Sequence, residues 1–323
     1  MSPPRRLHWA KRGQVFKLAD HPGRPWLNSH AQAPATLVLA DRVRVYFSCR
    51  PAPDAQGRYV SHTAFVDLAR NDLTRVLAVN DEPVMALGAR GCFDEFGVYP
   101  FSPINMGDTV RAFYGGWTRC ETTPYTVAIG VAESHDGGIR FQRLGPGPLI
   151  TSNTVDAFEI SGPKLRRFGS RWYLGYVAGV GWHEVGGRFE SIFKIKQATS
   201  TDGLNWQRTG HCVISDVLGA DECQASPDVF EMDGRFHMVF CFKHGTNFRD
   251  NARGYRIGYA TSDDLVNWQR HDHLCDLGVS AQGWDAQATG YPHVFEVDGQ
   301  WHLLYIGNNF GRDGFGLASL VSA

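Results

Sequence analysis

Acidic residues recur at matched positions along the chain, a few residues upstream of a series of prolines. In four stretches an aspartate lies six or seven residues before the proline, and in a fifth an asparagine takes that place. These residues are Asn28, Asp94, Asp156, Asp221 and Asp285. Carboxylates crowded into one small site repel one another, which raises some of their pKa values and leaves others low. General acid–base chemistry uses that split, so the pattern predicts candidate acids and bases.

Other polar and aromatic side chains flank these positions or end nearby apolar runs. The flanking residues are His30, Gln32, Glu95, Glu159 and Glu222. The residues that end apolar runs are Arg50, Trp117, Trp182, His183, Lys243 and Asn308. Tryptophan rings stack on sugar faces, and cationic side chains donate hydrogen bonds to hydroxyl or carboxylate groups. The alternative is structural, because loop acids form turns and large rings near strand ends pack. We favour function for the set because its register repeats.

The prolines belong to an internal repeat, which must position these residues. The segment SPDVFEMDGRFHMVF at 226–240 recurs as YPHVFEVDGQWHLLY at 291–305. Each copy has an apolar run, an Asp-Gly turn and an alternating run, which is the pattern of a β-hairpin. Weaker copies at 33–47, 99–114 and 162–176 make five units. With Pro100 chosen over Pro103 in the second unit, the steps are 66, 63, 64 and 65 residues between Pro34, Pro100, Pro163, Pro227 and Pro292.

A second motif follows three of these hairpins. Segments 129–141, 196–206 and 257–268 each read as a third strand that ends in a Ser-x-Asp turn and an aromatic residue. A short fourth strand would then lead into the next unit. Four antiparallel strands per unit are typical of a propeller blade, so the sequence predicts an all-β, five-bladed β-propeller. Trp206 and Trp268 recur in this motif, and we expect them to pack between the sheets.

The two ends of the chain predict how the ring closes. The fifth unit stops after GFGLASLVS without a fourth strand, while LHWAKRGQVF near the N-terminus aligns with LNWQRTGHCVI at 204–214. We expect the N-terminal strand to complete the last blade and remove an open sheet edge. The alternative is an unstructured N-terminal tail. The predicted single domain covers 1–323, with blades at about 28–90, 91–152, 153–216, 217–279, and 280–323 plus 5–18.

The propeller architecture gives the acids, donors and rings a common location. The first strand of each blade lines the central axis, and the residues just upstream of it ring one mouth of the channel. The ends of the second strands reach the same face. We therefore expect these side chains to converge on one funnel.

Composition excludes several classes of function. The 323 residues are 43% hydrophobic and 20% charged with a formal net charge of -1, so charge gives no case for a nucleic-acid or acidic-membrane partner. MSPPRRLHWAKRG has no apolar stretch of the kind that signal peptides and membrane spans need. The seven cysteines are odd in number and form no CxxC pair, which favours reduced thiols in a cytoplasm. No cofactor is expected, although axial carboxylates could hold a calcium ion.

The five-unit count, the S-x-D-G-x-x-W turns and the glutamate upstream of Gly-Pro in AFEISGPKL resemble a known family. It is the arabinanase, levansucrase and invertase superfamily of five-bladed propeller glycosidases, and the resemblance covers essentially the whole chain. It implies a base or nucleophile on blade one, an orienting aspartate on blade two and an acid glutamate on blade three. By this resemblance Glu159 is the general acid, and Asp94 or Glu95 is the blade-two carboxylate.

Two departures from the family's pattern bear on the mechanism. Glu159 lies four residues before Pro163, where the family usually has two, and blade one reads NSHAQAP with no carboxylate for the base or nucleophile. Asp285 or Asp94 could have taken over the base role, or His30 could assist it. Otherwise the substrate or external phosphate supplies the attacking group, or hydrolysis has been lost.

Three functions therefore stay open, and two of them have a carbohydrate as the partner. The first is hydrolysis of a small or terminal sugar, with Glu159 as proton donor and a second carboxylate activating water or attacking directly. A phosphorylase is its variant, with phosphate held by Arg50, Lys243 and His183. The second is a non-catalytic sugar-binding propeller, and the third is a protein-interaction scaffold. The regular acids and the balanced charge favour this order, and nothing in the sequence fixes the oligomeric state.

Overall fold

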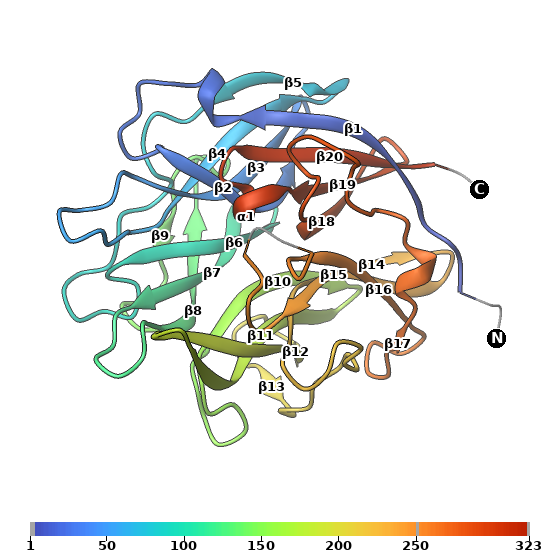
Figure 1. Cartoon of the computed structure of the whole chain (residues 1–323). Coiled ribbons are helices and arrows are strands. Elements are labelled where there is room, and N and C mark those ends of the chain that lie inside the picture. The colour runs from blue at the N-terminus through green and yellow to red at the C-terminus, as the bar shows by residue number, and fades with distance from the viewer. Residues whose placement is uncertain (1–3, 250–251, 322–323) are drawn as a thin grey trace.

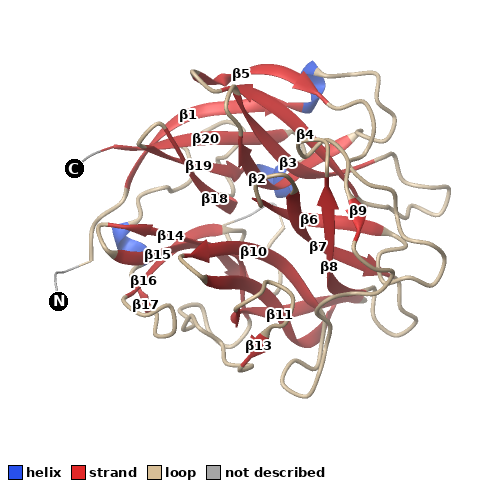
Figure 2. Cartoon of the chain, turned by 180° about the vertical axis from the view of Figure 1, so that it is seen from behind, coloured by secondary structure: helices blue, strands red, loops and turns tan. Residues whose placement is uncertain are grey.

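The computed structural model describes residues 4–249 and 252–321. Its strands form five four-stranded antiparallel sheets arranged around a central axis as the blades of a propeller (Figures 1 and 2). The predicted all-β, five-bladed β-propeller is confirmed.

Each blade has three inner strands and an outer fourth strand. Blades one and two consist of β2 (Ser29–Val38), β3 (Arg42–Arg50), β4 (His62–Ala69) and β5 (Asp72–Val79), then β6 (Gly97–Asn105), β7 (Val110–Thr118), β8 (Thr126–Ser134) and β9 (Gln142–Arg143). Blades three and four consist of β10 (Ile160–Phe168), β11 (Arg171–Val185), β12 (Arg188–Ser200) and β13 (Gln207–Arg208), then β14 (Glu222–Met232), β15 (Arg235–His244), β16 (Arg256–Ser262) and β17 (Gln269–Arg270). Blade five consists of β18 (Gly290–Val297), β19 (Gln300–Ile306), β20 (Gly314–Val321) and β1 (His8–Lys17). The helical turns are η1 (Leu18–Asp20), η2 (Asp272–Leu274) and α1 (Asn308–Gly311).

The N-terminal strand closes the ring, as the sequence predicts. β1 pairs antiparallel with β20, and Trp9 lies opposite Leu320 (Figure 1). The side chain of Trp9 is buried in the apolar cluster between blades four and five. The pairing supplies the fourth strand of the last sheet and covers the edge of β20, because an unpaired strand edge invites aggregation.

The apolar core lies between neighbouring blades. Between blades one and two, the ring of Tyr46 packs on Phe101 and Phe141 at centroid distances of 5.1 and 5.8 Å. Trp206 packs edge-on against Phe113 of blade two at 5.7 Å, and Trp268 joins the cluster between blades three and four. The expectation that these tryptophans pack between sheets is therefore confirmed.

A bulge before the repeat proline turns each first strand towards the axis. The preceding residue has a left-handed φ in four blades, namely Ala33 (50°), Gly162 (60°), Ser226 (53°) and Tyr291 (47°), and Tyr99–Pro100 is a cis bond. Strand pairing is interrupted at all five places. Because proline has no N–H to give to the ladder, the extra residue forms a bulge and the neighbouring side chain is re-aimed. The repeat prolines, Pro100 included, thus mark the bulges.

Just past these bulges, buried charged groups tie the first strands together. Asp228 accepts hydrogen bonds from Nδ1 of His293 at 2.8 Å and from Arg166 at 2.5 Å. The Thr36 N–H donates to Nε2 of His293 at 2.9 Å, so the ring is the neutral tautomer with its proton on Nδ1. Burial lowers the pKa of His293 to about 4. These contacts join blades one, three, four and five and hold the bulged strands in register.

All seven cysteines lie in the described part of the chain and are free thiols. They are Cys49, Cys92, Cys120, Cys212, Cys223, Cys241 and Cys275. Over the same residues, no helix is both long and apolar enough to cross a bilayer.

Candidate functional site

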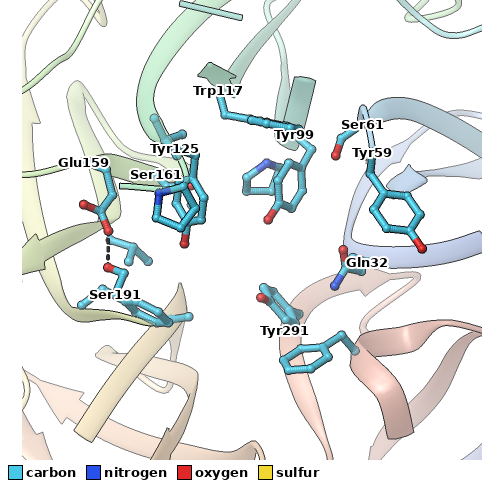
Figure 3. Close-up of a pocket in the computed structure, with 18 of the residues that line it drawn as sticks. Gln32, Tyr59, Ser61, Tyr99, Trp117, Tyr125, Glu159, Ser161, Ser191 and Tyr291 are labelled. Carbon is cyan, nitrogen blue, oxygen red and sulfur yellow. Dashed lines mark hydrogen bonds between the residues drawn. The ribbon is translucent and has the colours of Figure 1, made fainter. Parts of the chain in front are cut away.

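A cavity of about 720 Å³ lies on the propeller axis (Figure 3). The first strand of every blade contributes to its wall, through Gln32, Tyr99, Ser161, Ser226 and Tyr291. Several of these residues directly precede a repeat proline, so the bulges build the cavity. Left-handed backbone at a non-glycine residue costs of order 1–3 kcal/mol and persists where the surrounding structure holds it. The volume is within the range of sites that bind small ligands.

Glu159 is a buried carboxyl on the blade-three side of this cavity. Its side chain accepts a hydrogen bond from the hydroxyl of Ser191 (Figure 3). Gly179 makes room for it, because a Cβ there would lie 2.4 Å from Oε2 of Glu159. Burial raises the pKa of Glu159, and the hydrogen bond from Ser191 offsets part of that rise. Within the described residues no lysine or arginine pairs with it, so no ion pair opposes the effect of burial, which favours the protonated form.

Glu190 is a second carboxylate of the cavity wall and has a different neighbour. It pairs with the guanidinium of Arg249 at 2.5 Å. Glu159 directly precedes β10, whereas Glu190 lies on β12, which is 13 residues long and forms with the 15-residue β11 a hairpin that extends past those of the other blades. Two carboxyls with such unlike neighbours could divide the acid and base roles.

The opposite wall is cationic. Figure 3 shows Gln32 and Tyr59 across the cavity from Glu159. Arg50 donates to Oε1 of Gln32 at 3.1 Å, and Arg119 donates to the backbone oxygen of Tyr59 at 3.0 Å. Neither guanidinium pairs with a carboxylate in the part of the chain that the structure describes. An anion would therefore be well placed at this wall.

The charge of this wall also acts on His30. Burial, followed by the positive charges of Arg50 and Arg312, lowers the pKa of His30 to about 3. The imidazole is therefore neutral at pH 7, and its Nδ1 lies 3.0 Å from the hydroxyl of Ser29. A neutral ring can bind hydroxyl groups but adds no charge.

Lys243 brings a further cation to the blade-four side. Its side chain is 3% exposed, and its Nζ lies 3.3 Å from the ring centroid of Phe248 and 5.3 Å from that of Phe193. The ammonium group donates to the backbone oxygen of His244 at 3.3 Å. Burial lowers the pKa of Lys243. Cation–π contacts of this kind stabilise a desolvated ammonium group.

Aromatic rings cover much of the remaining wall. Trp117 stacks near Phe96, and its Nε1 is buried without a hydrogen-bond partner in the described structure. Tyr125 also lines the cavity and is backed edge-on by Trp182 at 5.2 Å. Flat rings with polar edges suit the apolar faces and hydroxyl rims of sugars.

Comparison with known proteins places the chain in a family. No family model matches it. The uncharacterized proteins Rv1502 and MT1551, from two strains of Mycobacterium tuberculosis, are 35% identical over 97% of this chain and 99% of their own length. The chain belongs to the Rv1502 family. A 1,2-beta-oligomannan phosphorylase of Thermoanaerobacter is 28% identical over 72% of each chain.

Solved structures resemble this Rv1502-family chain at the level of fold. One glycoside hydrolase has a TM-score of 0.73 and 16% identity over 99% of this chain and 93% of its own. A thermostable family-43 glycoside hydrolase has a TM-score of 0.67 and 14% identity over 91% of both chains. A structure reported with glycoside hydrolases of the GH130 family of mannoside phosphorylases, which target beta-1,2 mannosidic linkages in Candida mannan, has a TM-score of 0.69 and 12% identity over 99% and 95%. The predicted resemblance to five-bladed propeller glycosidases is confirmed for the fold.

Six of the predicted site residues do line the cavity of this Rv1502-family member. They are His30, Gln32, Arg50, Trp117, Glu159 and Lys243. The other ten lie outside its lining, which corrects the expectation that all of them converge on one funnel. They are Asn28, Asp94, Glu95, Asp156, Trp182, His183, Asp221, Glu222, Asp285 and Asn308.

The recurring carboxylates, which we define as Asp94, Asp156, Glu222 and Asp285, are buried within the blades. In blade two, Asp94 accepts hydrogen bonds from the hydroxyl of Tyr114, 20 residues downstream, and from Arg143 of the fourth strand. Their lengths are 3.0 and 2.7 Å. These contacts hold the carboxylate in an ion pair inside its own blade through Oδ2, while its buried Oδ1 has no hydrogen-bond partner among the described residues. A free base at Asp94 is therefore not what the structure provides.

Blades three and five repeat this arrangement. Asp156 accepts hydrogen bonds from Tyr176, Lys196 and Arg208 at 2.8 to 3.0 Å. Asp285 accepts them from Tyr305 at 3.0 Å and from Lys11 of the closing strand at 2.6 Å. Asp285 is thus held in an ion pair away from the cavity, so the base role foreseen for it is not supported.

In blade four Glu222, and not Asp221, takes the equivalent place. Glu222 pairs with Arg270 at 2.7 Å, and Phe242 stands where the other blades have tyrosine. Glu222 therefore lies in an ion pair outside the cavity lining, which corrects the expectation that it binds substrate. Among the described residues, no group of three or more histidine, cysteine, aspartate or glutamate side chains is arranged to hold a metal ion.

The remaining four corrections concern loops and turns. Glu95 accepts a hydrogen bond from the Gly91 N–H at 2.9 Å, and the exposed Asn28 donates its backbone N–H to Arg50. His183 is exposed on the extended hairpin. Asn308 uses its side-chain amide to fasten a turn of blade five. The side chains of Glu95 and Asn308 thus fix local turns, whereas Asn28 and His183 are exposed outside the cavity.

Sequence reasoning missed several residues of the cavity. They are Tyr99, Tyr125, Glu190, Ser191, Arg119 and Tyr291. Tyr99 and Tyr291 directly precede repeat prolines, so the bulge position was a signal for both. Glu190 and Ser191 lie on the extension peculiar to blade three, and no repeat marks them. Arg119 follows Trp117 closely but lies past the end of β7, and it carried no pattern of its own.

Proposed function

We propose that this protein is a carbohydrate-active enzyme that cleaves a glycosidic bond of a small or terminal sugar, with Glu159 as the proton donor. The observation that carries the proposal is a buried carboxyl on the cavity wall, hydrogen-bonded to Ser191 and raised in pKa by burial. Such a group can give its proton to the leaving oxygen as the bond between that oxygen and the anomeric carbon breaks. The glycosidase and phosphorylase names of the similar proteins support the same class of chemistry.

The cationic wall favours phosphate as the attacking group. The wall across from Glu159 carries Arg50 and Arg119 without a partner carboxylate among the described residues. A phosphate oxygen held there could bond to the anomeric carbon while the leaving oxygen takes the proton of Glu159. The products would be a glycosyl phosphate and a shortened sugar, and Glu159 would regain its proton from solvent. The 28% identity to a 1,2-beta-oligomannan phosphorylase supports this route.

Hydrolysis is the second candidate, and the position of Glu190 favours it. Glu190 lines the same cavity, and its pairing with Arg249 at 2.5 Å fixes its position there. In this route Glu190 takes a proton from a water whose oxygen attacks the anomeric carbon. The products are then two free sugars. We also propose a cytoplasmic location from the seven free cysteines, since that compartment keeps thiols reduced.

The test is a turnover screen with aryl glycosides and with β-1,2-, β-1,4- and α-linked oligosaccharides, each with and without inorganic phosphate. Phosphate-dependent release of a glycosyl phosphate supports phosphorolysis, and phosphate-independent release of free sugar supports hydrolysis. Glu159→Gln should abolish either activity. Glu190→Gln should abolish only hydrolysis. Arg50→Gln should reduce only the phosphate-dependent release of glycosyl phosphate.

The matched control for these variants is Glu95→Gln, because Glu95 lies in a loop outside the cavity. It should leave turnover unchanged. Binding of sugars without any product would overturn the catalytic proposal in favour of a sugar-binding propeller. If no sugar of the panel is bound or turned over, both the catalytic proposal and the sugar-binding alternative are overturned.

A further inference from the structure

A left-handed turn forms part of the blade-five side of the cavity. Asn309, Phe310 and Gly311 have consecutive φ values of 52°, 57° and 72°. Left-handed runs are rare because each non-glycine residue in them costs roughly 1–2 kcal/mol. Strain of this kind survives where neighbouring contacts impose it, and it concentrates at functional sites. The turn therefore calls for a reason beyond chain reversal.

Asn308 holds the start of this turn with both ends of its amide. Its Oδ1 accepts the Gln287 N–H at 2.7 Å, and its Nδ2 donates to the backbone oxygen of Gly283 at 2.9 Å. Its backbone N–H donates to Trp284 at 2.8 Å. After the turn, the backbone oxygen of Arg312 accepts the His30 N–H at 2.9 Å, which ties the exit to blade one. The strained backbone is thus fixed on both sides.

The fixed turn aims the ring of Phe310 at the cavity wall. The ring packs edge-on against Phe248 and Tyr255, each at a centroid distance of 6.0 Å. These three side chains line the main cavity and also a second cavity of about 20 Å³ behind them. The second cavity is about the size of one water molecule. The aromatic cluster therefore forms the partition between the two spaces.

We propose that Phe310 sets the length of sugar that the site accepts, by closing the blade-five end of the cavity behind one terminal unit. The proposal rests on the proposed function, since it concerns the same cavity. A sugar extended past that unit would need the space that the ring occupies. Removing the ring would join the second cavity to the first. The strained turn then has a purpose, because a relaxed turn would aim the side chain elsewhere.

The test compares wild type with Phe310→Ala by calorimetric titration. The probes are mannose, β-1,2-mannobiose and β-1,2-mannotriose, with the matching glucose, galactose and arabinose series. We expect Phe310→Ala to raise the affinity for the longer members relative to the shorter by about tenfold, the scale on which an apolar pocket discriminates one group. An unchanged ratio in a folded variant overturns the proposal. Phe310→Leu, which keeps an apolar contact, replaces the alanine variant if that does not fold.

The control is Asn309→Gly, which accepts the left-handed φ without strain and leaves the ring in place. It should keep the wild-type length preference and unfold at an equal or higher temperature. A length preference that shifts in Asn309→Gly as it does in Phe310→Ala overturns the role of the ring. A shifted preference without turnover in any variant overturns the proposed catalysis alone. Absence of saccharide binding to both proteins overturns the two proposals together.

Discussion

Two sets of acids in this molecule share a residue type and little else. The recurring carboxylates are buried at matched places in four blades, and each is satisfied by a cation of the outer strand. Glu159 and Glu190 occur only in blade three, face the cavity, and have unlike neighbours. The carboxylates that repeat in these four blades serve a structural need of each blade, namely the joint between its loop and its sheet. The groups fit for chemistry are those that depart from the repeat.

The largest effect expected from this comparison is on turnover. Glu159→Gln keeps the size of the side chain but removes the transferable proton, so turnover should fall by about 10² to 10⁴-fold. The melting temperature should stay near that of wild type, because no ion pair is lost. Steady-state rates on the best substrate of the screen, together with thermal denaturation, check both parts. Full activity in the variant would remove Glu159 from the reaction.

The next largest effect is expected on stability, from a change to one of the recurring carboxylates. Glu222→Ala removes the buried partner of Arg270 and leaves its guanidinium with the partly exposed Asp272, so we expect a loss of about 3 kcal/mol, at the low end for breaking a buried pair. The adjacent Asp221→Ala is the control and should change the free energy of unfolding by less than about 0.5 kcal/mol. Chemical denaturation of both variants makes the comparison. Equal losses in the two would contradict the assignment of Glu222 to the ion pair.

A smaller effect is expected on the pH profile. If Glu159 acts as an acid, the rate falls as pH rises through its pKa. The hydroxyl of Ser191 donates to the carboxylate and so favours the ionised form, which lowers the pKa of Glu159. Ser191→Ala should therefore move the alkaline limb of the profile up by about one pH unit, in line with a charged hydrogen bond. Ser161→Ala, another serine of the cavity wall, should leave the position of the limb unchanged.

The smallest effect is expected on the free energy of unfolding, from the removal of one tyrosine hydroxyl. Tyr176→Phe removes the donor to Asp156 while Lys196 and Arg208 remain, so we expect a loss of about 1 kcal/mol in unfolding free energy. The change makes blade three resemble blade four, which already has Phe242 at that position. A melting-temperature shift of a few degrees would agree with this size. A loss as large as that of Glu222→Ala would mean that the tyrosine hydroxyl is essential to the joint.

The fold was predictable because its determinants are local and repeated. The prolines fix the bulges, the Asp-Gly turns fix the hairpins, and the Trp9 segment carries the same motif as the third-strand ends of other blades. The ion-pair partners of the recurring carboxylates could also be recognised in the sequence. A Gln-Arg pair ends blades two, three and four at 142–143, 207–208 and 269–270, and its arginines are the partners of Asp94, Asp156 and Glu222.

The cavity was harder to predict because several of its residues come from what is not repeated. Glu190 and Ser191 depend on the length of one hairpin, and Phe310 depends on a left-handed turn that no local motif signals. They line the same cavity as Gln32 and Arg50 because the blades surround one axis. Residue spacing along the chain does not encode that proximity. The resemblance to propeller glycosidases supplied Glu159, whereas composition and periodicity alone gave it no more weight than Asp156.

The closing strand also sets the order in which the protein can be finished during synthesis. Among the strands of the propeller, β1 with Trp9 is synthesised first, and β20 with its partner Leu320 is synthesised last. Until then the segment that becomes β1 has no strand to pair with, and the ion pair between Asp285 and Lys11 cannot form. Contacts between such distant parts of a chain slow folding and prolong the exposure of unpaired strands. The ring of blades therefore stays open until β20 has been synthesised, and its last blade is the point at which a chaperone would have most to protect.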